Sequence, residues 1–190
     1  CKFITYAPES GSDDMLKRIK KKISKPKMLH SMRDAVRNGL NVKASFILGF
    51  PDETFKHALE TFGYIFHMSV IGIKDVSVFP FSPYPGSALF EDLHQQGQIT
   101  LDDAYFLKLS QGTASIPGSD TSAFERSYSP RTLGYMCLFG MALFYSVSFL
   151  VRPKRVFTLI KNLKNNKQES RLERSLLIFF ARRSEQNGLT

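Results

Sequence analysis

The chain has 190 residues, of which 43% are hydrophobic, and a formal net charge of +9. This length and apolar content predict a folded protein with one domain, or one domain with an appendage, and exclude a disordered chain. The basic excess lies at one end, because residues 131–190 hold 11 Lys and Arg against 3 Asp and Glu. We therefore expect this tail to meet lipid headgroups or nucleic acid, unless it is only a solvated basic helix face.

The first half alternates strand-like and helical patterns. Runs rich in β-branched and aromatic residues predict strands at residues 3–6, 42–48 and 76–79. Apolar residues at helical spacing predict helices that begin after an N-cap at Ser12, that run from Pro26 to Gly39, and that span residues 55–68. Strands separated by helices favour a parallel sheet with crossover helices, so the predicted fold class is α/β.

The second half divides into a weakly patterned segment and a helical tail. Residues 96–130, with the small polar run from Gly112 to Phe124, are interpreted as a connecting or lid-like segment. Residues 133–151 are 19 uncharged residues, and a basic helical pattern follows over 156–183. Such a run covers about 28 Å as a helix, just enough for a bilayer core. Polar and small residues dilute it, so we expect a core-packed or interfacial helix rather than a spanning one.

The two cysteines, Cys1 and Cys137, lie far apart and lack the spacing of a metal site or a disulfide framework. A reducing, cytosolic setting with membrane association through the tail is the predicted location. The sequence begins almost inside a strand, with neither a Met nor a signal-peptide pattern, and we expect it to be incomplete at its N-terminus.

Unusual chemistry follows the first predicted strand, in "PESGS". Sites of parallel α/β folds gather at the carboxyl ends of the strands. Glu9 offers two carboxylate oxygens, which suit vicinal hydroxyls such as a ribose diol, and Ser10 and Ser12 add polar groups near a helix N-terminus. Gly11 permits a close backbone approach or a positive φ. The alternative is an exposed Glu9 and a Ser12 that only caps the helix.

The other two strand ends carry "GFPDET" and "PFSPYPG". Ile47 and Leu48 suit the face of a flat aromatic ligand such as adenine, and Gly49 leaves room for it. The alternative is an ordinary turn in which Asp52 caps the next helix and Glu53 complements its dipole. The third segment holds three prolines and predicts a rigid loop, which forms a substrate-facing wall or a stiff connection.

Together, "PESGSDDMLKRIKK", "NGLNVKASFILGFPDET" and "PYPGSALFEDL" resemble the second half of a radical S-adenosylmethionine (SAM) domain. The chain is most similar to the cobalamin-binding, anaerobic-cyclase-like class of that superfamily. The resemblance implies the C-terminal half of a partial (β/α)6 TIM-like barrel over residues 1–97. A connecting segment over 98–130 and a basic, apolar helical tail over 131–190 then follow.

The resemblance also implies a SAM site. It places the ribose at Glu9, with Ser10 beside it, and the SAM carboxylate at Lys21. It places the adenine at Ile47, Leu48 and Gly49, and the sixth barrel strand ends at Phe79. The implied activity is SAM cleavage by a [4Fe-4S] cluster, followed by radical or cobalamin-linked methyl-transfer chemistry on an unidentified substrate.

One departure from the family is plain, because the cluster-binding C-x-x-x-C-x-x-C motif does not occur in this sequence. We expect it, with any cobalamin domain, in a missing N-terminal half, so that the chain by itself is inactive. A tRNA-modifying, methylthiotransferase-like enzyme is an alternative. Such enzymes usually have Gln at the position of Glu9 and an RNA-binding β-barrel afterwards, whereas this tail is helical, which disfavours nucleic acid as the partner. A non-catalytic membrane-adaptor module is a further alternative.

Overall fold

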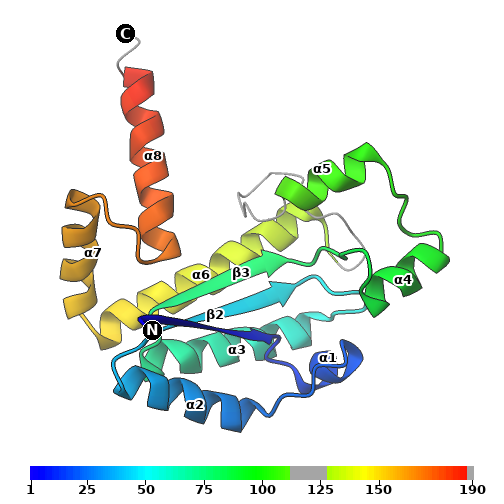
Figure 1. Ribbon diagram of the computed structural model, residues 1–190, viewed down its shortest axis with the longest axis horizontal. Coiled ribbons are helices and arrows are strands. Elements are labelled where there is room, and N and C mark those ends of the chain that lie inside the picture. Colours follow the sequence, from blue (N-terminus) through cyan, green and yellow to red (C-terminus); the bar gives the residue numbers. More distant parts are fainter. Residues whose placement is uncertain (112–127, 188–190) are drawn as a thin grey trace.

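The computed structural model describes residues 1–111 and 128–187 (Figure 1). Within these residues, one sheet contains the strands β1 (Phe3–Glu9), β2 (Asn41–Leu48) and β3 (Asp75–Pro80). The same residues form the helices α1 (Asp13–Arg18), α2 (Lys25–Arg37), α3 (Phe55–Ile71), α4 (Ala88–Gln95), α5 (Asp103–Gln111), α6 (Pro130–Val151), α7 (Lys154–Lys164) and α8 (Arg171–Asn187).

The sheet is parallel, with the strand order β1-β2-β3. Helices α1 and α2 connect β1 to β2, and α3 connects β2 to β3. This arrangement confirms the predicted α/β class, the three strands and the helices between them. The sheet is open and has three strands in the described part of the chain, so a barrel stays a prediction.

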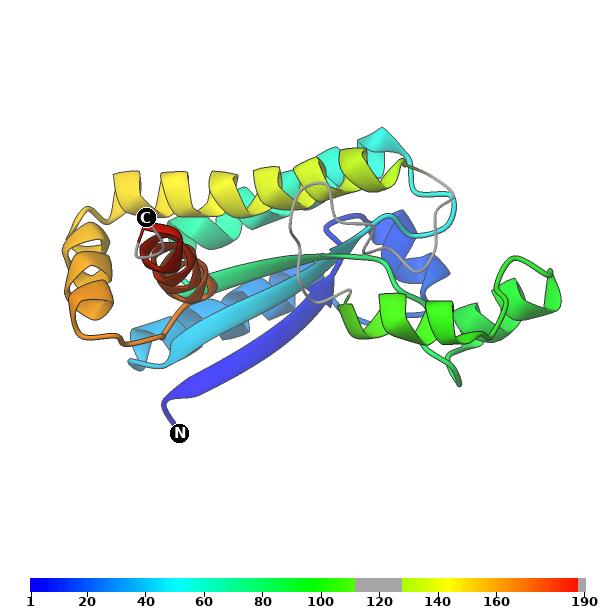
Figure 2. The same ribbon diagram turned by 90° about the horizontal axis from the view of Figure 1, so that it is seen from above.

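Helices α3 and α6 pack against each other and lie on the same side of the sheet (Figure 2). The apolar core forms between these helices and the strand residues that point toward them. Gly140 permits the close approach of α6, because a Cβ there would lie 3.2 Å from Val78 and 3.3 Å from Phe62. The tail therefore contributes to the same core as the sheet through Leu133, Met136, Cys137, Phe144 and Tyr145.

The opposite face of the sheet is more open. Cross-strand partners on this face include Thr5 with Lys43, Ser45 with Ser77, and Ile47 with Phe79. Each of these side chains is exposed or half-buried, whereas the β2 residues between them are buried. Only one face of the sheet is thus fully covered by the described helices.

A buried polar network joins the amino end of β3 to the tail. The hydroxyl of Tyr145 on α6 donates to the carboxylate of Asp75, which also accepts the backbone N–H of Arg171 at 2.9 Å. Arg155 donates to the carbonyl oxygen of Ile73 at 3.0 Å. Burial and the neighbouring Asp75 raise the pKa of Tyr145. These contacts fix α6, the start of α7 and the start of α8 to the sheet.

The structure refines two predictions for the second half. The expected connecting segment contains a helix, α5, while the polar run from Gly112 to Phe124 lies outside the described residues. The basic pattern over 156–183 forms two helices, because the chain turns between them, where Asn166 has φ 53°. Among the described residues, α6 is long and apolar enough to cross a membrane by length and composition, and 33% of its apolar window is buried in the fold.

Candidate functional site

The turn after β1 is built onto helix α3. Ser10 is fully buried, and its hydroxyl lies 3.2 Å from that of Thr61 and accepts the N–H of Ser12 at 3.1 Å. The N–H of Gly11 also donates to the Thr61 hydroxyl, at 3.0 Å. A Cβ at Gly11 would lie 2.5 Å from the carbonyl oxygen of Glu60, so the glycine is required for close approach to α3. The structure thus uses Ser10 inside the fold, and Ser12 is the N-cap of α1 by position but makes no side-chain cap bond.

Glu9 and Lys21 contact each other. The Nζ of Lys21 lies 3.0 Å from Oε1 of Glu9, and the side chains are 34% and 21% exposed for Lys21 and Glu9. The residues expected at the ribose and at the carboxylate of SAM therefore form a half-buried ion pair at the end of β1. Both groups remain accessible to a ligand because neither is enclosed.

Backbone strain accompanies these polar ends. Glu9, the last residue of β1, has φ 64°, and Asp52, which follows the neighbouring strand β2, has φ 60°. A left-handed conformation costs a non-glycine residue about 1–2 kcal/mol. Strain of this kind gathers at functional sites, where the surrounding fold maintains it.

The end of β2 separates the residues that were expected to face adenine. Successive strand residues point to opposite faces. Leu48 is accordingly buried in the core under the helices, whereas Ile47 is half-buried on the open face opposite Phe79. Gly49 has φ 86° and is buried, and a Cβ there would lie 2.7 Å from the Leu133 side chain of α6. Ile47 and Phe79 are therefore the predicted apolar residues that the structure brings together.

Neither Asp52 nor Glu53 takes part in the start of helix α3. Thr54 is its N-cap, and Thr54 and His57 form a reciprocal capping box. Asp52 is exposed and lies 3.8 Å from Arg18, so it does not cap the helix. Glu53 also does not lie in the first turn, because α3 starts at Phe55. The alternative interpretation, in which Asp52 caps this helix and Glu53 complements its dipole, is therefore wrong.

Glu53 instead folds back into the protein. It is 4% exposed, and its Oε2 accepts the N–H of Gly49. Burial raises the pKa of Glu53 to about 7, although hydrogen bonds from the Gly49 and Phe50 backbones act in the opposite direction. The carboxylate is thus a buried group that titrates near neutrality at the carboxyl edge of the sheet.

Several buried polar atoms near this edge have no hydrogen-bond partner within the described part of the chain. They are the Ser12 hydroxyl, Oε1 of Glu53, and the hydroxyls of Ser82 and Tyr128. The first three follow β1, β2 and β3 in turn. Tyr128 belongs to the same region, because the Glu53 carboxylate adds to the effect of burial in raising its pKa. An unpaired buried polar group costs about 1–3 kcal/mol, so each such atom is a candidate for contact with a ligand or water.

The loop after β3 is fixed by the segment that follows it. The Tyr105 hydroxyl on α5 donates to the carbonyl oxygen of Pro83 in the proline-rich loop. Phe81 lies 5.0 Å from Phe50, ring to ring, and so joins the loops after β3 and β2. Phe79 is covered by the guanidinium of Arg171, 4.6 Å from the ring centre. Sequence reasoning missed Tyr105 and Arg171 and gave Glu53 a different role, because their contacts form only in the folded chain.

Comparison with known proteins gives partial similarity to two methyltransferases. No protein-family model matches the chain. It is 28% identical over 123 residues, or 60% of its length, to the cytidylyl-2-hydroxyethylphosphonate methyltransferase of Streptomyces wedmorensis. It is 32% identical over 92 residues, or 48% of its length, to an uncharacterized methyltransferase of Pyrococcus horikoshii. The chain spans 22% and 19% of these two proteins, about a fifth of each.

Proposed function

We propose that this chain forms the SAM-facing half of a radical SAM core domain in an enzyme that transfers a methyl group, by radical or cobalamin-linked chemistry. The observation that carries the proposal is the polar carboxyl edge of the parallel sheet. There, the Glu9–Lys21 pair lies at the end of one strand, and buried polar atoms without a hydrogen-bond partner among the described residues follow all three strands. The similarity to two methyltransferases supports methyl transfer as the reaction class.

The residues at this edge fit the chemistry of SAM. The Glu9 carboxylate can accept hydrogen bonds from two ribose hydroxyls. The Lys21 ammonium, now 3.0 Å from Glu9, can hold the carboxylate of the methionine part. Ile47 offers a half-buried apolar side chain to the adenine on the open face of the sheet, beside Phe79, whose ring carries the Arg171 guanidinium. When bound, SAM supplies the activated methyl group, and these residues would bind and orient it.

A [4Fe-4S] cluster does not fit on the residues of this chain. Cys1 is exposed and Cys137 is buried in α6, and the sequence holds no other cysteine. The described residues also contain no group of three or more His, Cys, Asp or Glu that could hold a metal ion. The proposal therefore requires cluster ligands from other polypeptide. It predicts a C-x-x-x-C-x-x-C motif encoded upstream of the Cys1 codon, and the absence of such a motif would contradict the radical SAM assignment.

The role of Glu9 is tested by calorimetric titration of SAM into the chain and into its Glu9→Gln variant. The amide keeps the size of the side chain but removes the charge. A hydrogen bond to a charged group contributes about 1.5–3 kcal/mol, so we expect the affinity to fall roughly 10- to 100-fold. The matched control is Glu91→Gln, which neutralises an exposed carboxylate on α4 and should leave SAM affinity unchanged. An unchanged affinity in Glu9→Gln, or an equal loss in both variants, would overturn the proposal.

A further inference from the structure

The outward face of α6 is mostly apolar, with Ser146 as an exposed polar residue within it. Outward positions recur at three- and four-residue spacing, and the sequence holds no charged residue between Arg131 and Arg152. The most exposed large side chains are Tyr135 at 63%, Phe139 at 53% and Leu150 at 82%. Such a stripe is unusual for a helix that already buries its opposite face in the core.

Helix α3 continues this apolar surface beside α6. Its exposed large side chains fall on one stripe, because they recur over the helix at intervals of about one turn: Phe55, Leu59, Phe66 and Val70. The ring of Phe62 on α3 packs edge-on against that of Phe139 on α6, with centres 5.0 Å apart. Figure 2 shows the two helices forming one layer on the outside of the sheet. We call the outward stripes of α3 and α6 the outer apolar surface.

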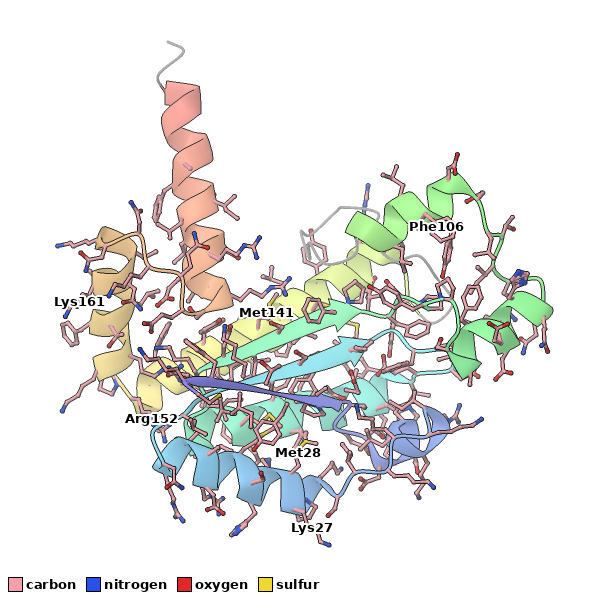
Figure 3. All side chains as sticks on the ribbon, in the orientation of Figure 1. Lys27, Met28, Phe106, Met141, Arg152 and Lys161 are labelled. Atoms are coloured by element: carbon pink, nitrogen blue, oxygen red, sulfur yellow. The ribbon has the colours of Figure 1, made fainter. Side chains whose placement is uncertain are left out.

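Basic residues surround the end of this surface. Helix α7 follows α6 directly and exposes Phe157, which is 72% exposed, on the same side as Lys161 and Lys164. Figure 3 shows Lys161 extending from α7 away from the sheet. The acidic residues nearby are already engaged, since Glu169 pairs with Lys74 at 3.0 Å and Glu173 is buried. An exposed aromatic ring among lysines is typical of a helix that lies in the headgroup region of an anionic membrane.

The packing of α6 favours an in-plane position over a membrane-spanning one. Spanning would remove Tyr145 from Asp75, and Ser148 from the guanidinium of Arg155, and would expose the buried face of the helix. A second copy of the chain is disfavoured as the occupant, because association through this face would bring two strongly basic tails together. Further strands would extend the sheet at its edges and would leave the outer face of the helices uncovered.

We propose that the outer apolar surface, with the α6–α7 corner around Leu150 and Phe157, binds the surface of an anionic bilayer without spanning it. The apolar side chains enter the acyl boundary, while the lysines of α7 contact the anionic headgroups. The carboxyl edge of the sheet is a separate region, so this proposal does not depend on SAM binding.

The experiment uses the absence of tryptophan from the sequence. Single Leu150→Trp and Phe157→Trp variants of the whole chain each carry one fluorescent reporter at a highly exposed apolar position. The control is Phe106→Trp on α5, where the replaced ring is 51% exposed and lies at the opposite end of the molecule from α7 (Figure 3). The probe is vesicles of equal parts phosphatidylglycerol and phosphatidylcholine, compared with pure phosphatidylcholine.

We expect the emission of both corner reporters to shift to the blue with the anionic vesicles and to be quenched by brominated acyl chains. The α5 reporter should change in neither respect. The double variant Leu150→Ser/Phe157→Ser should bind these vesicles at least tenfold more weakly, and high salt should release the wild-type chain. Circular dichroism checks that each variant is folded.

Three results would overturn the proposal. Unchanged emission of both corner reporters with anionic vesicles would show that the corner does not enter lipid. Equal binding to pure phosphatidylcholine would refute the part assigned to the lysines. A blue shift that appears without lipid as protein concentration rises, together with a dimer in sedimentation velocity, would identify a second copy of the chain as the occupant.

Discussion

Replacement of the buried Glu53 by Gln should change how the stability of the protein depends on pH. The folded-state pKa of Glu53 is about 7, above the ordinary value of 4.5. The folded protein holds the proton of the Glu53 carboxyl group more tightly than the unfolded chain does. The protonated group therefore stabilises the folded state fully below about pH 4.5, and this stabilisation is lost as the pH rises through about 7, where the buried carboxyl group ionises. Gln cannot ionise, so the variant lacks this loss.

The size of the effect follows from the two pKa values. Each pKa unit corresponds to about 1.4 kcal/mol, so a shift from 4.5 to about 7 corresponds to roughly 3 kcal/mol. No correction for solvent screening is needed, because the Glu53 side chain is almost fully buried. The free energy of unfolding of Glu53→Gln, relative to wild type, should therefore rise by roughly 3 kcal/mol between about pH 4.5 and 7 and stay level above that range.

Urea unfolding followed by far-UV circular dichroism at several pH values between 4 and 8.5 measures this difference. The control is Glu91→Gln, which makes the same replacement at an exposed carboxylate on α4. A Glu53→Gln difference that does not change with pH would refute the reasoning. It would mean that Glu53 is solvated or paired in solution.

Two further predictions concern the turn after β1. Lys21→Met should weaken SAM binding by about 1.5–3 kcal/mol, measured by calorimetric titration. The same replacement of the exposed neighbours Lys20 and Lys22 should have little effect. Equal losses in all three variants would indicate general electrostatics instead of a specific contact. Gly11→Ala should lower the free energy of unfolding by about 1–3 kcal/mol, because its Cβ would lie 2.5 Å from the α3 backbone. The control is Gly63→Ala in α3, where a Cβ would meet nothing within 4 Å. This variant should be more stable than wild type by up to about 1 kcal/mol in the same urea titration. A similar loss of stability in both variants would contradict a close contact between Gly11 and α3.

The elements could be predicted because their signals are local. The strand containing Val42 and Leu48 ends in the apolar run Phe46 to Leu48, and the helix before Gly39 has a proline in its first turn and a glycine just beyond its end. Parallel pairing followed from the alternation of strands and helices. The helix α5 was missed because residues 103–111 lie in a segment of mixed polarity, where contact with the proline-rich loop supports the helix.

The site was only partly predictable, because its contacts are between distant residues. Nothing in "GFPDET" indicates that Glu53 turns back to Gly49 instead of facing the helix dipole. The sequence placed Glu9 and Lys21 in one site, but it could not show that they contact each other across 12 residues. Ile47 and Leu48 looked equivalent until the pleat of β2 assigned them to opposite faces of the sheet.

A crystal structure of the chain grown with saturating SAM would show whether the carboxyl edge of the sheet is a SAM site. We expect SAM at this edge, with its ribose hydroxyls within hydrogen-bond distance of Glu9 and its carboxylate at Lys21. The 3.0 Å contact between these two side chains would then be opened or shared with the ligand. SAM bound elsewhere, or no bound SAM with the Glu9–Lys21 pair unchanged, would contradict the account.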